Sequence, residues 1–250
     1  SYSDDFALPR RDYLKWMGAA GLAATGISGH AQSAWPNKPI RLVVPFTPGG
    51  VTDASARLVA EQMSKRLGQQ MIVENKPGAS GNIGTSQVAA AEPDGYTLVL
   101  GFDGTIVINP HVFPSIPFDP VKDFIPVSVS VIQKNVLVVN SNVPVRNVKE
   151  LIDLAKANPG KLSFGSAGNG TSQHLSGELF KYLTGTDIVH VPYKGSAAAM
   201  TDLLGGQITM SFVDIPTAIS NIKTGKIRAL GVTSLQPSPA LPNVLPLAQQ

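Results

Sequence analysis

Cysteine is absent from this sequence of 250 residues, and charged residues make up only 15% of it. Without cysteine the chain has no thiolate nucleophile, no Cys-ligated metal site and no disulfide. The formal net charge is only +3, and the basic residues are scattered along the chain, so a nucleic-acid surface is not expected. The hydrophobic share of 43% is typical of a globular protein that is stabilised by a packed core.

Long hydrophobic runs are also missing, and the most apolar stretch lies near the N-terminus. It covers residues 16–27 and is too short to span a membrane. Arg10-Arg11 precede it, and a small-residue cleavage signal ends at Ala31. We therefore expect residues 1–34 to be a cleaved export signal, either of the twin-arginine type or for the general secretory route. An amphipathic first helix is the alternative.

Two glycine-rich loops contain neither lysine nor arginine. The first loop, 47–53, follows an apolar strand over 40–46, and the second loop, 165–171, follows a strand that ends at Phe164. A helix is expected to begin at each loop, so each presents unpaired backbone N–H groups and the positive end of a helix dipole. Two such loops could hold one anion from both sides. For Gly49-Gly50, a tight turn without any ligand is the alternative.

Several catalytic and nucleotide-binding motifs are excluded by spacing. No Gly-Lys-Ser/Thr triplet follows a glycine loop, which excludes a nucleotide P-loop. Ser166 has Phe164 two residues before it, where a nucleophile elbow needs glycine. The histidines show no pair with metal-ligand spacing, and His190 stands alone. We expect no cofactor and no metal ion.

Short apolar strands alternate with helices after residue 35, which is typical of an α/β fold with mostly parallel sheets. Strands are expected at 40–46, 71–74, 97–101, 136–140, 162–165, 188–191, 208–213 and 227–233. Helices are expected at 52–67, 82–91, 148–157, 171–184 and 196–204. The proline-rich segment 109–126 is expected to be irregular and to separate two α/β blocks. A ligand would bind in the cleft between them.

The helix expected at 171–184 shows a regular apolar spacing. Leu175, Leu179 and Leu183 recur on one side of it. This pattern predicts that the three leucines form its buried stripe.

Four polar side chains near strand ends are candidates for contact with the rest of a ligand. Asp103 could accept a hydrogen bond from a hydroxyl, ammonium or amide group, and a local Asp turn is the alternative. His174 could be a polar wall of the cleft or a surface cap. Tyr193 and Asp214 each follow a strand of the second block, which places them near the cleft.

A series of short motifs runs through nearly all of the chain after Trp35. They are Trp35-Pro36, Pro45-Phe46, Glu74-Asn75-Lys76-Pro77-Gly78, Pro93-Asp94-Gly95-Tyr96-Thr97, Ile108-Asn109-Pro110, Ser166-Ala167-Gly168, Val191-Pro192-Tyr193-Lys194-Gly195, Asp202-Leu203-Leu204-Gly205-Gly206 and Ala229-Leu230-Gly231-Val232-Thr233-Ser234. In this order they resemble the solute-binding receptors of tripartite tricarboxylate transporters, the Bug family. The resemblance implies a two-lobed, type II-like periplasmic binding protein that closes around a small carboxylate. Backbone amides and bridging waters, rather than arginine, hold the carboxylate in that family.

The resemblance also implies a set of ligand contacts and a division into lobes. The implied contacts are Phe46, Thr47, Gly49, Gly50, Asp53, Asp103, Gly104 and Thr105 from lobe I, and Ser166, Ala167, Gly168, Thr171, His174, Tyr193 and Asp214 from lobe II. Residues 35–127 would form lobe I and residues 128–227 lobe II. Residues 228–250 would begin a return to lobe I, which stays incomplete because family members continue beyond this point.

The function implied by the resemblance is capture of a carboxylate without catalysis. The expected partners are the membrane subunits of a tripartite transporter, and the expected location is the periplasm. A carboxylate sensor for a two-component signalling system is the alternative, with a kinase ectodomain as its partner. A hydrolase that uses Ser166 and His174 is a third possibility. The sequence does not identify the carboxylate.

Overall fold

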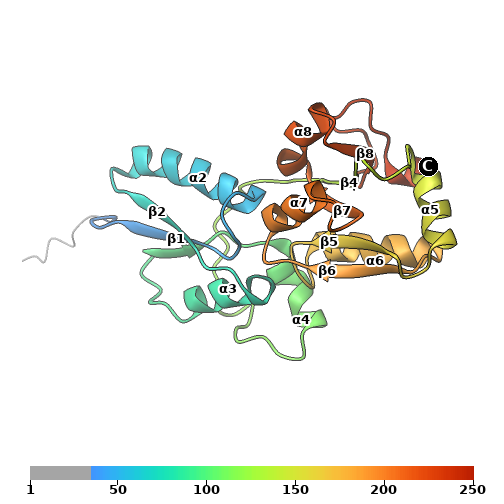
Figure 1. Ribbon diagram of the computed structural model, residues 1–250. Helices are drawn as coiled ribbons and strands as arrows, with labels where there is room; N and C mark the ends of the chain where they lie inside the picture. The colour runs from blue at the N-terminus through green and yellow to red at the C-terminus, as the bar shows by residue number, and fades with distance from the viewer. Residues whose placement is uncertain (1–34) are drawn as a thin grey trace, which may run out of the picture. The chain divides into compact units, whose positions relative to one another are not determined.

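Figure 1 shows a computed structural model of the chain, which describes residues 35–250. The expected export signal, residues 1–34, lies outside the described residues. All the helices and strands below belong to one compact unit, Lys38–Gln250. Within the described part of the chain, no helix has both the length and the apolar character needed to cross a membrane.

The strands and helices agree with those expected from the sequence to within a few residues. The strands are β1 (Ile40–Val44), β2 (Met71–Asn75), β3 (Thr97–Val99), β4 (Asn135–Asn140), β5 (Leu162–Ser166), β6 (Ile188–Pro192), β7 (Met210–Asp214) and β8 (Ile227–Val232). The α-helices are α2 (Val51–Leu67), α3 (Asn82–Ala89), α4 (Asn109–Val112), α5 (Val148–Ala157), α6 (Ser172–Thr184), α7 (Ser196–Leu204) and α8 (Ile215–Lys223). Short helical turns are η1 (Ala79–Gly81), η2 (Gly104–Ile108) and η3 (Leu247–Gln249). Helices α4 and α8 are additions to the expected set.

The first sheet is parallel and has the strand order β2-β1-β3. The central strand β1 is almost fully buried, and Ile40 and Leu42 pack with Ala56 and Ala60 of helix α2. Small alanines allow the helix to lie close to the sheet. The loop between β1 and α2 therefore leaves the sheet at the C-terminal end of its central strand, where ligands of α/β folds bind.

The second sheet has the order β6-β5-β7-β4-β8. Strands β6, β5 and β7 are parallel, whereas β4 is antiparallel to β7 and β8. Strand β8 thus pairs within the second sheet, whereas the sequence leads us to expect that residues 228–250 begin a return to the first lobe. Every residue of β4 is buried, so its backbone needs hydrogen-bonding partners on both edges, and β8 supplies the second one. Gln250 also donates from Nε2 to the Leu230 carbonyl (3.0 Å).

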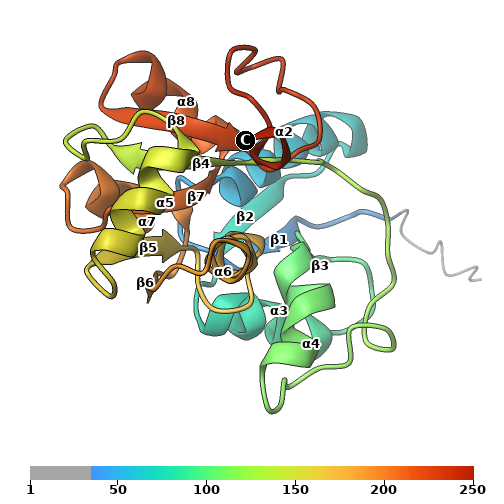
Figure 2. The ribbon, with the colours of Figure 1, turned by 90° about the vertical axis from the view of Figure 1, so that its right-hand side faces the viewer.

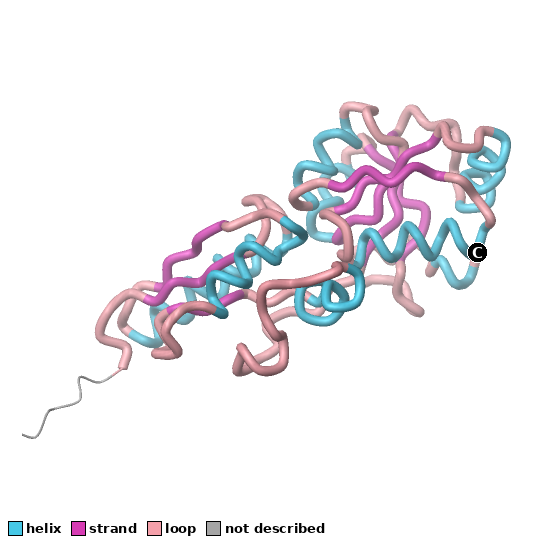
Figure 3. Tube along the Cα trace, turned by 90° about the horizontal axis from the view of Figure 1, so that it is seen from below, coloured by secondary structure: helices cyan, strands magenta, loops and turns pink. Residues whose placement is uncertain are grey.

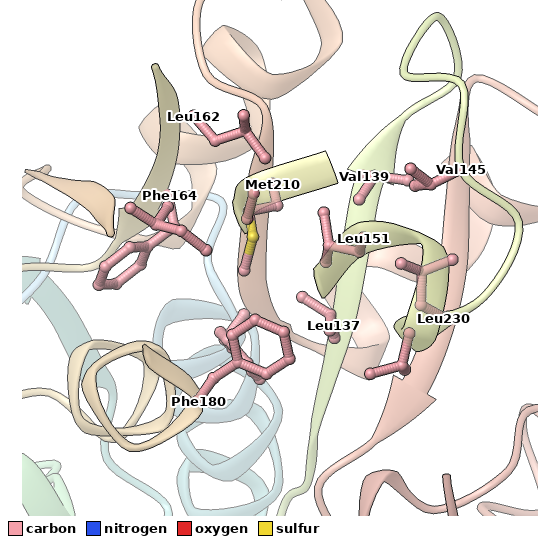
Figure 4. Packing of buried hydrophobic residues seen from close by; sticks show 13 residues of the cluster. Leu137, Val139, Val145, Leu151, Leu162, Phe164, Phe180, Met210 and Leu230 are labelled. Carbon is pink, nitrogen blue, oxygen red and sulfur yellow. The ribbon is translucent and has the colours of Figure 1, made fainter. Parts of the chain in front are cut away.

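Helices cover both faces of the second sheet (Figures 2 and 3). Alternate residues of β4 point to opposite faces. Leu137 and Val139 join a core with helices α5 and α6, part of which Figure 4 shows around Met210 and Phe180. Val136 and Val138 join a second core with α7 and α8. Two packed cores hold the sheet in place between its helices.

Helix α6 buries a different face from the one expected. Leu175, Leu179 and Leu183 are between 41% and 72% exposed, so the prediction that they form its buried stripe is wrong. The face that packs on the sheet carries Gly177 and Phe180 instead. A side chain at Gly177 would collide with the Phe164 ring. The glycine allows the helix to approach the sheet closely on this side, and that approach decides which face is buried.

Candidate functional site

A small pocket lies where loops from both sheets meet. It is lined by Phe46, Thr47, Gly50, Val51, Thr52, Phe102, Ala167, Gln173, Gly195, Ser196 and Asp214. These residues lie at or just after the C-terminal ends of strands, or at the first turns of the helices that follow. The described residues of this lining include no lysine, arginine or histidine.

Three helices begin at this pocket without a side-chain cap. The N-cap residues Gly50 of α2, Gly195 of α7 and Asp214 of α8 all line the pocket, and none makes a side-chain capping hydrogen bond. The first N–H groups of a helix have no partner inside the helix. They carry a partial positive charge that favours an anion. At α8, however, Ile215 N donates to the Lys134 carbonyl (3.3 Å) and Pro216 has no N–H. The N-termini of α2 and α7 are therefore the ones that offer an anion backbone donors in place of a basic side chain.

The first glycine loop is held in shape from behind by Asp53. This buried carboxylate accepts hydrogen bonds from Gly49 N (3.0 Å) and Asn75 Nδ2 (2.9 Å) and pairs with Arg57 (3.0 Å). Burial alone would raise the pKa of Asp53, but these hydrogen bonds and the Arg57 charge lower it below its ordinary value. Phe46, Thr47 and Gly50 line the pocket, whereas Gly49 and Asp53 position the loop.

The segment after β3 contributes a phenylalanine to the pocket. The Phe102 ring meets the Phe46 ring edge-on, with centroids 5.1 Å apart. Asp103 accepts a hydrogen bond from Gly104 N (2.8 Å), and burial raises the pKa of its carboxyl. Thr105 is buried and donates to the Ser80 carbonyl (3.3 Å). The three residues expected here, Asp103, Gly104 and Thr105, are all outside the pocket wall.

The second glycine loop contributes Ala167 to the pocket, and its neighbours brace the loop. Ser166 Oγ accepts from Gly168 N (3.1 Å), and Thr171 Oγ1 donates to the Gly168 carbonyl (2.7 Å). Both side chains are buried. Ser166, Gly168 and Thr171 therefore fix the path of the loop from behind the pocket wall.

Two stacked histidines support this loop. Their ring centroids are 4.1 Å apart; His190 Nε2 lies 2.7 Å from Ser166 Oγ, and Gly170 N donates to His174 Nδ1 (3.1 Å). Burial, followed by the neighbouring His174, lowers the pKa of His190 to about 4, and burial lowers the pKa of His174. The expectation that His190 stands alone is wrong. The hydrolase pairing of Ser166 with His174 is not formed, because Ser166 contacts His190 and is itself buried.

Tyr193 is placed behind the pocket rather than in its wall. Its hydroxyl donates to Asp202 Oδ2 (2.7 Å), and its ring packs against the core under α7 and α8. Burial and the Asp202 carboxylate raise its pKa to about 12. Its backbone N–H donates to the Ser166 carbonyl (3.0 Å), so Tyr193 also supports the second loop.

Asp214 is a fully buried carboxylate in the pocket wall. It accepts hydrogen bonds from Ser196 Oγ (2.9 Å) and Gln173 Nε2 (3.2 Å). Burial raises its pKa to about 6; the two hydrogen bonds oppose this shift and the nearby Asp103 adds to it. Asp214 joins Phe46, Thr47, Gly50 and Ala167 as the residues of the expected set that meet at the pocket.

The structure adds pocket residues that were not expected, among them Gly195, Ser196 and Gln173. Gly195 and Ser196 begin the helix that follows the strand expected at 188–191, so they form a third strand-to-helix turn that could have been recognised. An added side chain at Gly195 would collide with Thr47 Oγ1. Gln173 carries no comparable signal, because only the packing of α6 turns it inward.

Comparison with known proteins identifies relatives along nearly the whole chain. The family model described as "Tripartite tricarboxylate transporter family receptor" matches residues 55–250. A protein of Pseudomonas sp. (strain P51), described as "UPF0065 protein in tcbD-tcbE intergenic region", is 40% identical over 93% of this chain and 70% of its own length. Protein BugT of Bordetella pertussis is 37% identical over 91% of this chain and 71% of its own length.

Two similar solved structures carry bound ligands. R. palustris Rpa4515 with adipate is 40% identical, with a TM-score of 0.84, over 86% of this chain and 72% of that chain. MatC (Rpa3494) from Rhodopseudomonas palustris with bound malate is 31% identical, with a TM-score of 0.82, over 86% of this chain and 73% of that chain. These findings confirm the expected family resemblance and the α/β binding-protein fold.

Proposed function

Because the chain belongs to the receptor family of the tripartite tricarboxylate transporters, we propose that it is a periplasmic solute-binding protein for a small carboxylate. The observation that carries the proposal is the meeting of two helix N-termini without side-chain caps, those of α2 and α7, at one pocket. Relatives with bound adipate and malate support a carboxylate as the ligand class.

Backbone donors are sufficient for useful affinity. Hydrogen bonds to a charged group contribute roughly 1.5–3 kcal/mol each. A handful of them brings binding to about −8 kcal/mol, which corresponds to micromolar affinity. The aromatic pair Phe46 and Phe102 would shield such bonds from water. Capture by this route needs no catalytic group.

The membrane subunits of a tripartite transporter are the proposed partners, as the family description suggests. The receptor would release its carboxylate to them after capture. A sensor kinase would use the same capture step, so co-purification with candidate membrane subunits, not ligand binding, distinguishes the two roles.

The proposed function predicts that small carboxylates raise the melting temperature of the protein. Bound ligand stabilises the folded state by mass action, by about 2.7 kcal/mol at a ligand concentration of 100 times Kd. We would screen mono-, di- and amino-carboxylates by thermal shift, each beside the corresponding amide, and measure the hits by titration calorimetry. The proposal fails if no carboxylate shifts the transition or if the neutral amides act equally.

A matched pair of glycine variants tests the location of the site. Gly195→Ala introduces a methyl group against Thr47 Oγ1, whereas a methyl group at Gly205, at the other end of α7 and outside the pocket, would lie 3.5 Å from its nearest neighbour, the Thr201 carbonyl oxygen. We expect Gly195→Ala to weaken carboxylate binding about tenfold or more, because the two loops can no longer approach. Gly205→Ala should bind within about threefold of the wild type. Equal affinities of the two variants in calorimetry would place the site elsewhere.

A further inference from the structure

We propose that the natural ligand carries a protonated amine in addition to its carboxylate, and that Asp214 binds this amine. The inference rests on the proposed function, since it concerns the same pocket. It assigns the N-termini of α2 and α7 to the carboxylate and Asp214, in the pocket wall, to the amine.

Asp214 is a buried carboxylate that pairs with no basic side chain among residues 35–250. It is 0% exposed, and its side-chain donors, Ser196 and Gln173, are both neutral. The described residues that line the pocket supply no basic side chain. Burying a carboxylate costs much free energy unless an opposite charge accompanies it. A cationic group on the ligand would supply the missing charge.

Gln173 has a buried side-chain oxygen without a hydrogen-bond partner among the described residues. Its side chain is almost fully buried (1% exposed). Its amide Nε2 donates to Asp214, so the amide oxygen Oε1 is not engaged by that carboxylate. That Oε1 has no hydrogen-bond partner among the described residues, and the same is true of Thr47 Oγ1. Gln173 Oε1 therefore lacks a donor, while each Asp214 oxygen accepts one neutral hydrogen bond and retains a lone pair for another donor. An ammonium group offers three N–H donors, whereas a hydroxyl group offers one.

The rest of the wall is also suited to a cation. Phe46 and Phe102 both line the pocket, and an aromatic face attracts a nearby ammonium group. Asp103 is close enough to Asp214 to affect its titration, so two carboxylates act on this region. A second carboxylate on the ligand would meet their repulsion, whereas an ammonium group would relieve it.

The test compares ligands that differ by one amine. Titration calorimetry at pH 7.5 on the folded wild-type protein would use L-aspartate against succinate and 4-aminobutyrate against butyrate. We expect the amine member of at least one pair to bind tenfold tighter or more. In Asp214→Asn this preference should shrink to about threefold or less. Asp153→Asn is the matched control, because Asp153 is exposed and pairs with Lys149 on the surface, and it should keep the full preference.

The outcomes separate this inference from the proposed function. Equal or tighter binding of the deaminated ligands by the wild type overturns the inference and leaves carboxylate capture standing. So does a preference that Asp214→Asn retains in full. If no ligand of either pair binds and the wider carboxylate screen also fails, the proposed function itself is contradicted. The wild-type ratio alone can overturn the inference, so the test holds even if Asp214→Asn does not fold.

Discussion

At the scale of single residues, burial lowers the pKa of His190 and raises the pKa of Asp214. The pKa of His190 is lowered to about 4, below its ordinary 6.5, so the unfolded chain binds more protons than the folded chain between these values. The pKa of Asp214 is raised to about 6 from 3.8, so the folded chain binds more protons between those values. Acidification below pH 6.5 therefore destabilises the fold through His190 and stabilises it through Asp214.

This opposition predicts distinct pH profiles for two variants. His190→Gln retains a group that can bond with Ser166 but removes the titration, so it should lose less stability than the wild type between pH 7 and pH 4.5. The difference should be on the order of 2 kcal/mol, allowing for the partial exposure of the ring. Asp214→Asn should show the reverse, with a larger loss on acidification than the wild type. Urea unfolding at the two pH values measures both, and parallel profiles for all three proteins would contradict the assignment.

At the scale of elements, helix α6 illustrates what sequence patterns can and cannot predict. Its bounds follow from Thr171, which caps His174 N (3.3 Å), and from Gly185 at its C-terminal end. Hydrophobic spacing does not predict which face of α6 is buried, since Leu175, Leu179 and Leu183 are exposed. The close contact of Gly177 with Phe164 depends on the position of the sheet, which no local pattern contains.

A pair of alanine variants checks this orientation. Phe180 is buried against Phe212, with centroids 6.3 Å apart, whereas the neighbouring Leu179 is 56% exposed. Phe180→Ala should lower the free energy of unfolding by about 3 kcal/mol, because it leaves a cavity in the core. Leu179→Ala should change it by no more than about 0.5 kcal/mol. Chemical denaturation measures both free energies of unfolding. A larger loss of stability for Leu179→Ala than for Phe180→Ala would show that the leucines form the buried face.

The pocket could be predicted from the sequence to the extent that strand-to-helix turns mark it. Phe46, Thr47, Gly50, Ala167 and Asp214 all follow expected strands and line the pocket. Turn position does not distinguish a residue in the wall from one that braces the loop behind it, and Thr105, Thr171 and Tyr193 belong to the latter kind. That distinction depends on side-chain direction, which packing decides.

At the scale of the whole molecule, the segment 121–132 leaves apolar side chains exposed. It lies in the sequence between the last strand of the first sheet and the first strand of the second. Val121, Ile125, Val127, Val129 and Ile132 are each 78% or more exposed. Valines alternate with serines here, a pattern typical of a strand with one buried face, yet the described chain pairs no strand with this segment. Exposed strand-like segments promote pairing between molecules.

We expect this segment to drive concentration-dependent association of the chain. A Val127→Ser, Val129→Ser double variant should shift the sedimentation profile toward the monomer, with an unchanged circular dichroism spectrum. Tyr182→Ser is the control, because Tyr182 is 83% exposed but lies on α6, and it should associate as the wild type does. Equal association of all three proteins would show that the segment does not participate.

The N-termini of α2 and α7 at the pocket also bear on how such receptors diversify. Their donors belong to the peptide backbone, so most substitutions cannot delete them, and anion capture is buffered against mutation. In the proposed site, selectivity would be concentrated in a few side chains such as Asp214 and Gln173, which contact each other (3.2 Å). A lineage could then exchange one ligand for another by changing those few positions while it retains a working receptor at every step.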